Sequence, residues 1–229
     1  LRAAFTCHDL VFLLFPMHPK MVQWAQNAVI AAKDANVKHI VRSSGAGANS
    51  SSPYFMPKTQ GEIDDIIRSS GIPYTLTLPA SFMQNFVNFF AQDIQNGVLY
   101  QPVGDGKIAW VDVRDIAAVN TEVIINPERF ANQELTITGA ENLSYKDALQ
   151  IIAETINRPI NFVDVPEEKA NAAMQGYGMP QFNIDMLSSL NSIIKAGYAE
   201  GTSSTVAEVT GKSPISFSQF VVDYKASWL

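Results

Sequence analysis

The chain has 229 residues, of which 47% are hydrophobic and 17% charged, so it can bury a globular core and is not expected to be disordered. Its formal net charge of −6 argues against nucleic acid or an anionic membrane as a partner. Cys7 is the only cysteine, which excludes an internal disulfide and favours a reducing, cytoplasmic compartment. The longest apolar run is far shorter than the roughly 20 residues of a membrane span, and no basic segment precedes it as in a signal peptide.

Two strand–helix pairs are predicted in the first third of the chain. Residues Leu10–Phe15 form a wholly apolar run of strand length, which is typical of a strand buried on both faces. Met21–Ala35 then spaces its apolar residues as one face of a helix. The short run His39–Arg42 predicts a second strand. A Ser- and Pro-rich loop follows, and then a helix that begins near Pro57 and ends at Gly71.

A third strand is predicted at Tyr74–Leu78, followed by a helix from Ser81 to Gly97 whose phenylalanines lie at helical spacing. Such an aromatic stripe is more often a core face than a pocket. Short strands at 98–103 and 107–111 flank a Gly-Asp-Gly turn, which is typical of a hairpin. Asp112 is the expected N-cap of the next helix.

The rest of the chain is predicted to form a smaller, mostly helical lobe. It contains strands at 135–138 and 160–165 and two capping-box patterns, Ser144 with Asp147 and Ser216 with Gln219. We therefore expect a strand–helix core over residues 1–130 and a substrate lobe over residues 131–229, closely packed on it.

Several familiar chemical motifs are absent. No glycine precedes Gly45, so the glycine-rich turn that opens a nucleotide-binding sheet is missing. The chain has neither a phosphate-binding lysine motif nor a G-x-S-x-G elbow. Its three histidines lack metal-ligand spacing, and no metal site is predicted.

Five stretches carry a family resemblance. They are DLVFLLFP from Asp9, VKHIVRSSGAG from Val37, K-x-x-x-E at Lys58 and Glu62, SGIPYTLTLPASFMQN from Ser70, and TGKSPISFSQFV from Thr210. In this order and at these separations they resemble the NmrA-like branch of the atypical short-chain dehydrogenase/reductases, from Leu1 to about Tyr224. The resemblance implies a parallel, Rossmann-type (doubly wound) α/β sheet with a small C-terminal lobe, and NADP(H) or NAD(H) as cofactor.

The resemblance also implies that the family's first β-α-β-α-β unit, with its glycine-rich loop, would precede Leu1. We therefore expect cofactor binding to be weakened or lost in this chain. The run Leu10–Phe15 would then be an exposed sheet edge, and such edges pair with other chains. Self-association through this run is expected.

Candidate site residues follow strand ends, where parallel sheets bind ligands. The resemblance implies that the nicotinamide ribose passes Ser43, Ser44 and Gly45, where small residues allow close approach; the alternative is an ordinary strand-ending turn. It also implies that Lys58 bonds the ribose or supports proton delivery; the alternative is a solvated surface lysine. Tyr54 and Lys58 reproduce Y-x-x-x-K, but a helix beginning at Pro57 would leave Tyr54 in the loop, which makes a catalytic Tyr54 the weaker interpretation.

Six further positions complete the candidate set. Phe15 and Pro16 end the first strand, and the resemblance implies that this turn contacts the cofactor; the alternative is a core residue followed by a strand terminator. The resemblance places the nicotinamide carboxamide and the acceptor near the end of the third strand, at Pro79, Ala80, Phe82 and Asn85.

The sequence thus predicts an NAD(P)H-dependent oxidoreductase that transfers hydride to a flat, conjugated, quinone-like acceptor. The alternatives are a non-catalytic sensor of NADP(H) that acts through a protein partner, and a fragment that binds no ligand. The sequence names neither the acceptor nor the preferred cofactor.

Overall fold

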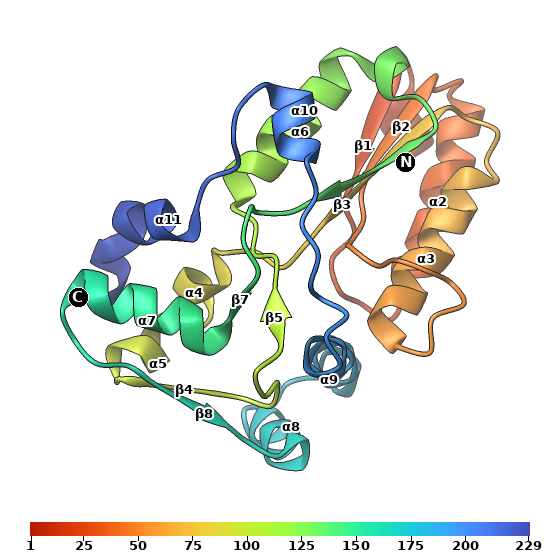
Figure 1. The fold of residues 1–229 in the computed structure, drawn as a ribbon. Helices are drawn as coiled ribbons and strands as arrows, with labels where there is room; N and C mark the ends of the chain where they lie inside the picture. The colour runs from red at the N-terminus through yellow and green to blue at the C-terminus, as the bar shows by residue number, and fades with distance from the viewer.

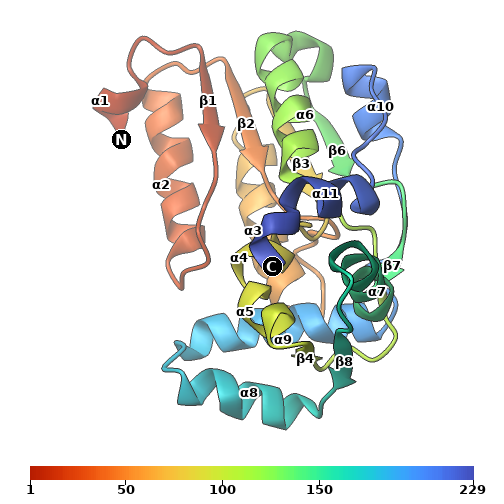
Figure 2. The same ribbon diagram turned by 90° about the vertical axis from the view of Figure 1, so that its left-hand side faces the viewer.

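Four parallel strands form the main sheet of this computed structural model, which describes all residues from 1 to 229 (Figure 1). Their order across the sheet is β1-β2-β3-β6, with bounds Leu10–Leu13, His39–Ser43, Tyr74–Pro79 and Gln133–Ile137. Helices cover both faces, so the Rossmann-type α/β fold is confirmed. Both β1 and β6 are edge strands, and the four carboxyl ends point toward the lobe (Figure 2).

Side-chain alternation along β2 assigns the two faces of the sheet. Ile40 packs in the cluster under α2 (Met21–Asp34) and α3 (Phe55–Arg68), and its neighbour Val41 packs in the cluster under α6 (Val113–Ile125). Successive residues of a strand point to opposite faces, so each strand contributes to both layers. The face covered by α2 and α3 is called here the α3 face, and the other the α6 face.

The edge strand β1 is covered along its length on the α3 face and only at its first residue, Leu10, on the α6 face. Val11 and Leu13 are buried there, whereas Phe12 is 41% exposed and Leu14 is 67% exposed on the α6 face. The prediction that this run is buried on both faces is therefore wrong. The reason is that the cluster under α6 includes Leu10 at the start of β1 but not Phe12 or Leu14, which border an open groove beside α6.

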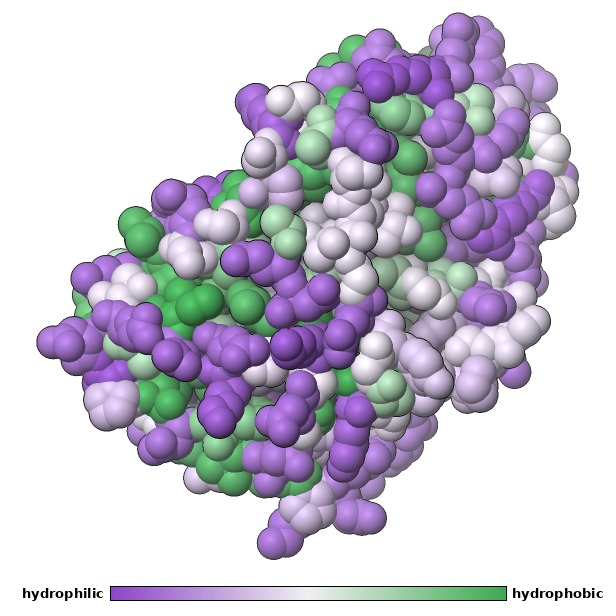
Figure 3. All heavy atoms as spheres, viewed as in Figure 1, coloured by the Kyte–Doolittle hydropathy of each residue, from purple (hydrophilic) through white to green (hydrophobic).

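The lobe has its own core of 17 buried residues, centred on Phe86, Trp110, Tyr145 and Trp228. Its elements are α4 (Asn85–Asn88), α5 (Ala91–Gln95), β4 (Val98–Gln101), β5 (Lys107–Ile108), β7 (Leu143–Ser144), α7 (Tyr145–Ile156), β8 (Asn161–Asp164), α8 (Glu167–Gly176), α9 (Gln181–Lys195) and α11 (Phe217–Tyr224). The remaining elements are α1 (Arg2–Phe5), α10 (Thr205–Thr210) and two 3-10 turns at Pro127–Phe130 and Lys225–Trp228. Hydrophobic side chains reach the surface over α7 and the β4–β8 pair, where Tyr100 is exposed (Figure 3).

The boundary between core and lobe does not fall at residue 130. Strand β6 pairs with β3 in the main sheet, from Thr75 opposite Gln133 to Pro79 opposite Ile137. Residues 85–108 instead build the lobe core together with α7 and α11. The two parts are therefore interleaved along the chain, and a single sequence boundary cannot separate them.

Three local predictions are corrected. The helix expected from Ser81 to Gly97 is two short helices, α4 and α5. The expected hairpin is absent, since β4 pairs in parallel with β8 and β5 pairs antiparallel with β7. Helix α3 begins at Phe55 and accommodates Pro57 in its first turn, where backbone N–H groups lack intrahelical partners anyway.

The predicted helix caps are confirmed, two of them in full and one in part. Asp112 accepts a hydrogen bond from the Arg114 N–H and is the N-cap of α6. Ser144 and Asp147 form the complete capping box. Ser216 accepts from the Gln219 N–H, but the Gln219 side chain bonds Asp223 instead, so only half of that box is present. No helix is both long and apolar enough to cross a membrane.

Candidate functional site

The carboxyl ends of β2, β3 and β6 are joined by main-chain hydrogen bonds beyond the strands themselves. The Ser44 N–H donates to the Thr77 carbonyl at 2.7 Å, and the Ala46 N–H donates to the Pro79 carbonyl at 2.9 Å. The Ala80 N–H donates to the Ile137 carbonyl at 2.9 Å. The turns after β2 and β3, which carry most of the predicted cofactor residues, thus lie side by side at one edge of the sheet.

An apolar groove of about 340 Å³ opens beside these turns, on the α6 face. Ten residues line it: Phe12, Leu14, Ser43, Phe82, Val113, Ile116, Ala117, Asn120, Thr121 and Ile124. It brings together the predicted residues Ser43 and Phe82, whose positions are 39 apart in the sequence. None of the lining residues is an Asp, Glu, His, Lys, Arg, Cys or Tyr, so the groove holds no titratable side chain.

Two polar groups in the groove are free to bind a ligand. The Ser43 hydroxyl has no hydrogen-bond partner within the protein. Asn120 is buried, and its Oδ1 accepts a hydrogen bond from Thr77 Oγ1 at 3.0 Å, which leaves its amide NH₂ without a partner. A flat ligand with a polar substituent is what such a pocket suits, because apolar walls bind the ring and a few polar groups orient it.

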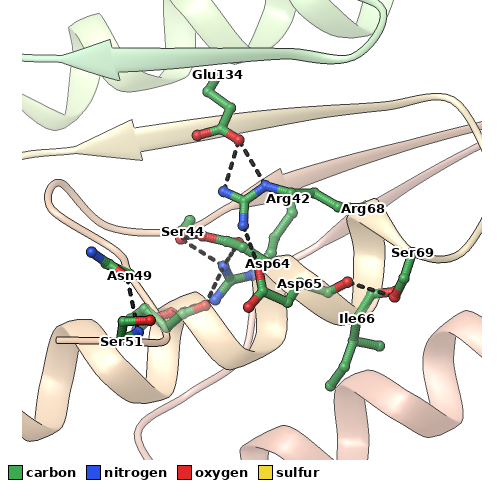
Figure 4. Close-up of polar contacts among 11 residues, drawn as sticks. Arg42, Ser44, Asn49, Ser51, Asp64, Asp65, Ile66, Arg68, Ser69 and Glu134 are labelled. Atoms are coloured by element: carbon green, nitrogen blue, oxygen red, sulfur yellow. Dashed lines mark hydrogen bonds and ion pairs between the residues drawn. The ribbon is translucent and has the colours of Figure 1, made fainter.

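Ser44 faces the opposite way. Its hydroxyl accepts a hydrogen bond from Arg42 Nη1 at 2.6 Å and donates one to Asp64 Oδ2 at 2.7 Å, on the α3 face (Figure 4). The side chain is fully engaged inside the protein. Any contact between Ser44 and a cofactor therefore has to come from its main chain.

Arg42 and Asp64 form an ion pair beneath this turn, with exposures of 1% and 0%. Arg42 also bonds the side chain and the carbonyl of Gln60. Burial raises the pKa of Asp64, although Arg42 and Ser44 oppose that rise. The guanidinium likewise has its pKa lowered, chiefly by burial.

Lys58 and Tyr54 lie at the start of α3 and do not line the groove. The Lys58 N–H donates to the Tyr54 carbonyl at 3.1 Å, so Tyr54, as the N-cap, is one helical turn from Lys58 after all. The Tyr54 ring packs edge-on against Tyr198 of the lobe, with centroids 6.2 Å apart. Lys58 is exposed, and its ammonium makes no hydrogen bond or ion pair within the protein.

The other predicted residues lie around the groove without lining it. Phe15 is half-buried against the core cluster of the α3 face, and Pro16 is exposed. Pro79 is buried, and Ala80 packs against the cluster under α6. Asn85 begins α4, and its N–H donates to the Phe82 carbonyl at 3.1 Å, which fixes the turn that presents Phe82.

Asn120 is one of the groove residues that sequence reasoning missed. A signal for it exists, because Asn120 follows Val119 on the inward side of an amphipathic helix, where a polar residue needs a partner. The sequence alone could not tell whether that partner would be internal or a ligand. The groove also includes Phe12, which the strand pattern placed in the core.

The sequence model of the NmrA-like family matches residues 1–214. The chain belongs to the NmrA-like family. An NAD(P)H azoreductase of Xenophilus azovorans is 34% identical over 228 residues, which are 100% of this chain and 79% of that protein. An agroclavine dehydrogenase of Claviceps fusiformis is 34% identical over 69% of this chain and 56% of that protein.

Solved structures agree on the fold of this NmrA-like protein. The NADPH-dependent quinone oxidoreductase of Escherichia coli, in complex with NADPH, has a TM-score of 0.87 at 22% identity, covering 97% of this chain and 78% of that one. The Citrobacter triphenylmethane reductase complexed with NADP(H) scores 0.85 at 22% identity, with the same coverage. The negative transcriptional regulator NmrA, in complex with NAD, scores 0.77 at 14% identity, covering 100% of this chain and 79% of that one.

The groove fits one half of a nicotinamide dinucleotide better than the other. Its apolar walls, the Ser43 hydroxyl and the Asn120 amide suit the nicotinamide ring and its ribose. A diphosphate is usually held by charge-assisted bonds or by the N–H groups of a helix start. No Lys or Arg lines the groove, so the lining residues supply no positive charge for the diphosphate.

Proposed function

We propose that this NmrA-like protein is an NAD(P)H-dependent reductase that transfers hydride to a flat, conjugated acceptor such as an azo dye or a quinone. The supporting observation is the apolar groove with its two free polar groups, in a chain 34% identical over its whole length to an NAD(P)H azoreductase. The bound nicotinamide supplies the hydride, and the protein contributes position and a dry surface.

The groove residues have separate roles in this proposal. Ser43 and Asn120 orient the nicotinamide and its ribose through hydrogen bonds, while Leu14 and Phe82 pack on the flat rings and keep water out. Because no titratable side chain lines the groove, a proton for the reduced acceptor comes from water or from the α3 start. Lys58 is the proposed donor of hydrogen bonds at that start.

The test is steady-state oxidation of NADPH by the purified chain with an azo dye, a triphenylmethane dye and a quinone. We expect turnover with at least one acceptor. Lys58→Ala should lower kcat/KM about tenfold to a hundredfold, because a lost charge-assisted hydrogen bond is worth about 1.5–3 kcal/mol. The matched control is Lys33→Ala, an exposed lysine in the last turn of α2, and it should leave kcat/KM unchanged.

Cofactor affinity is a separate part of the proposal. With no cation lining the groove, we expect a Kd for NADPH above about 1 mM, equivalent to less than about 4 kcal/mol of binding. Calorimetric titration measures it, and the turnover assays therefore need NADPH in the millimolar range. A micromolar Kd would contradict this part and would mean that other residues bind the diphosphate.

The second candidate function is a non-catalytic sensor that binds a nicotinamide cofactor and acts through a protein partner. The absence of any titratable group from the groove favours it, since general acid–base chemistry then has no resident group there. Cofactor binding without turnover of any of the three acceptors, together with a specific protein partner, would select this alternative over the reductase.

A further inference from the structure

The turn after β2 is bonded on its α3 face to a buried charged network of Arg42 and Asp64, which has no role in the proposed chemistry. Arg42 and Ser43 are consecutive residues of β2, yet Ser43 lines the groove and Arg42 points to the α3 face. There the guanidinium contacts Asp64 and the side chain of Gln60, both on α3, and the Ser44 hydroxyl at 2.6 Å (Figure 4). Ser44 completes a closed set of contacts by donating to Asp64 at 2.7 Å.

The other limb of the same loop is also fastened to α3. The Asn49 N–H donates to the Pro57 carbonyl at 3.0 Å. Gly61 lies directly under the backbone of Ser50, since a Cβ at this position would lie 2.1 Å from the Ser50 nitrogen. Helix α3 thus holds the loop from residue 44 to residue 52 at both limbs, with Asp64 beneath the limb that borders the groove.

Stability does not account for the charges in this network. Well-packed apolar residues often replace a buried ion pair with no loss of stability, because the attraction between the two charges barely compensates for the hydration that both lose on burial. Here the balance is worsened by the Arg42 Nε, which is buried without a partner. An apolar pair would hold α3 against β2 equally well, but it could not bond the Ser44 hydroxyl from two sides.

We propose that Arg42 and Asp64 are positioning residues, which fix Ser44 from below and thereby set the backbone of Ser43–Gly45 at the edge of the groove. The ligand-binding consequence rests on the proposed function, since it is Ser43 that faces the ligand. The positioning itself does not depend on which ligand the groove takes.

The test is the double variant Arg42→Met/Asp64→Leu, which keeps an apolar contact between β2 and α3. We expect its stability to equal or exceed that of the parent, while amide hydrogen exchange at Ser44 and Ala46 becomes at least tenfold faster. The Ile40 amide, bonded to the Pro73 carbonyl at the other end of β2, should be unchanged. Measured at NADPH concentrations below saturation, kcat/KM for NADPH should fall at least tenfold.

Two further variants keep the test decisive. Ser44→Ala leaves the ion pair intact and removes the link to the turn, so it should accelerate the same two amides even if the double variant does not fold. Arg42→Lys should also lose the protection of the two amides against exchange. The reason is that an ammonium cannot span Ser44, Asp64 and Gln60 as the planar guanidinium does. Asp65→Leu/Arg68→Met is the matched control, because this pair is partly exposed and also lies on α3.

The outcomes separate the two proposals. A stable double variant with parental exchange at Ser44 and Ala46 overturns the positioning role, as does equal acceleration in the control. If the parent protein turns over no acceptor, the proposed function fails, and the exchange measurements still decide whether the ion pair positions the turn.

Discussion

At the end of β2 the two faces of the sheet differ in how completely they are filled. On the α3 face, Arg42, Ser44 and Asp64 form a buried network in which one nitrogen alone lacks a partner. On the α6 face, Ser43 and Asn120 border an open apolar groove and keep unused hydrogen-bonding groups. From this contrast we propose that the closed face sets the position of the turn and that the open face receives the ligand.

The largest effect is expected from breaking the closed face. Arg42→Ala leaves the Asp64 carboxylate buried without its partner, and such losses destabilise by about 3–5 kcal/mol. Urea denaturation measures the change. Arg68→Ala on α3, the helix that carries Asp64, removes partly exposed ion pairs with Asp65 and Glu134 and should lose no more than about 1 kcal/mol. Equal losses in the free energy of unfolding would show that burial does not make the Arg42–Asp64 pair more costly to break than an exposed pair.

Gly61→Ala tests the second attachment of the same loop. The new Cβ overlaps the Ser50 backbone, so the loop has to move, and we expect a loss of about 2–3 kcal/mol in thermal or urea unfolding. Gly45→Ala is the control, because nothing lies within 4 Å of a Cβ at that position. A tolerated Gly61→Ala would mean that the loop is not pressed onto α3.

The wall of the open groove can be weakened through Asp112, which caps α6. Burial alone would raise its pKa, but hydrogen bonds from Arg114 and from Gln84 (2.9 Å) outweigh burial and lower it. Because the pKa of Asp112 is lower in the folded protein than the value of about 3.9 in the unfolded chain, its ionised carboxylate stabilises the fold at pH values above about 3.9. This contribution is lost as the pH falls through the folded-state pKa. Asp112→Asn should therefore destabilise by about 2 kcal/mol at pH 7.

The pH dependence supplies the check on Asp112. The difference between Asp112→Asn and the parent should shrink below about pH 4, measured by urea unfolding across pH 3–7. A difference that stays constant over this range would show that the charge of Asp112 contributes nothing and that only its shape matters.

The uncovered part of the open face should make the chain self-associate. Strand β1 is an edge with unpaired main-chain groups, and Phe12 and Leu14 are exposed beside it. We propose pairing with a second copy through or near residues 10–15, and Leu14→Lys should weaken it at least tenfold, about 1.4 kcal/mol. Sedimentation of both proteins measures this, and a monomeric parent would contradict it.

The smallest effect is expected at Tyr54. Its ring packs on Tyr198 and lies outside the groove, so Tyr54→Phe should lower kcat/KM by less than about tenfold. A general acid usually contributes about 10²–10⁴-fold. A loss in that range would place the proton donor at the start of α3, which the backbone bond between Tyr54 and Lys58 would then explain.

Much of the sheet follows from local sequence patterns. Strand β2 and the N-caps Asp112 and Ser144 are recognisable because each depends on a few adjacent residues. The pairing of β4 with β8 is not, because it joins Val98 to Asn161 and no periodicity connects segments so far apart. The same limit placed the lobe boundary at residue 130 instead of interleaving the two parts.

In the candidate site too, features that depend on adjacent residues could be predicted and contacts between distant segments could not. Ser43 and Phe82 follow from their places at strand ends, where parallel sheets bind ligands. The partner of Arg42 does not follow, although an arginine in an apolar strand signals that one is needed. Several acidic residues could have served, and Asp64 is selected by the packing of α3 on β2. Gly61 also gave a signal, since a glycine inside a helical pattern often marks a close backbone approach.

The interleaving of the two parts limits how this molecule can move. The chain enters the lobe after β3, returns through α6 and β6, leaves again at β7, comes back with α10 on α6, and ends in the lobe with α11. A lobe joined by one linker can swing as a rigid body, but one tethered at so many points cannot rotate without bending every tether. Ligand exchange should therefore depend on side-chain motions at the groove, on the picosecond-to-nanosecond scale, and not on microsecond domain closure.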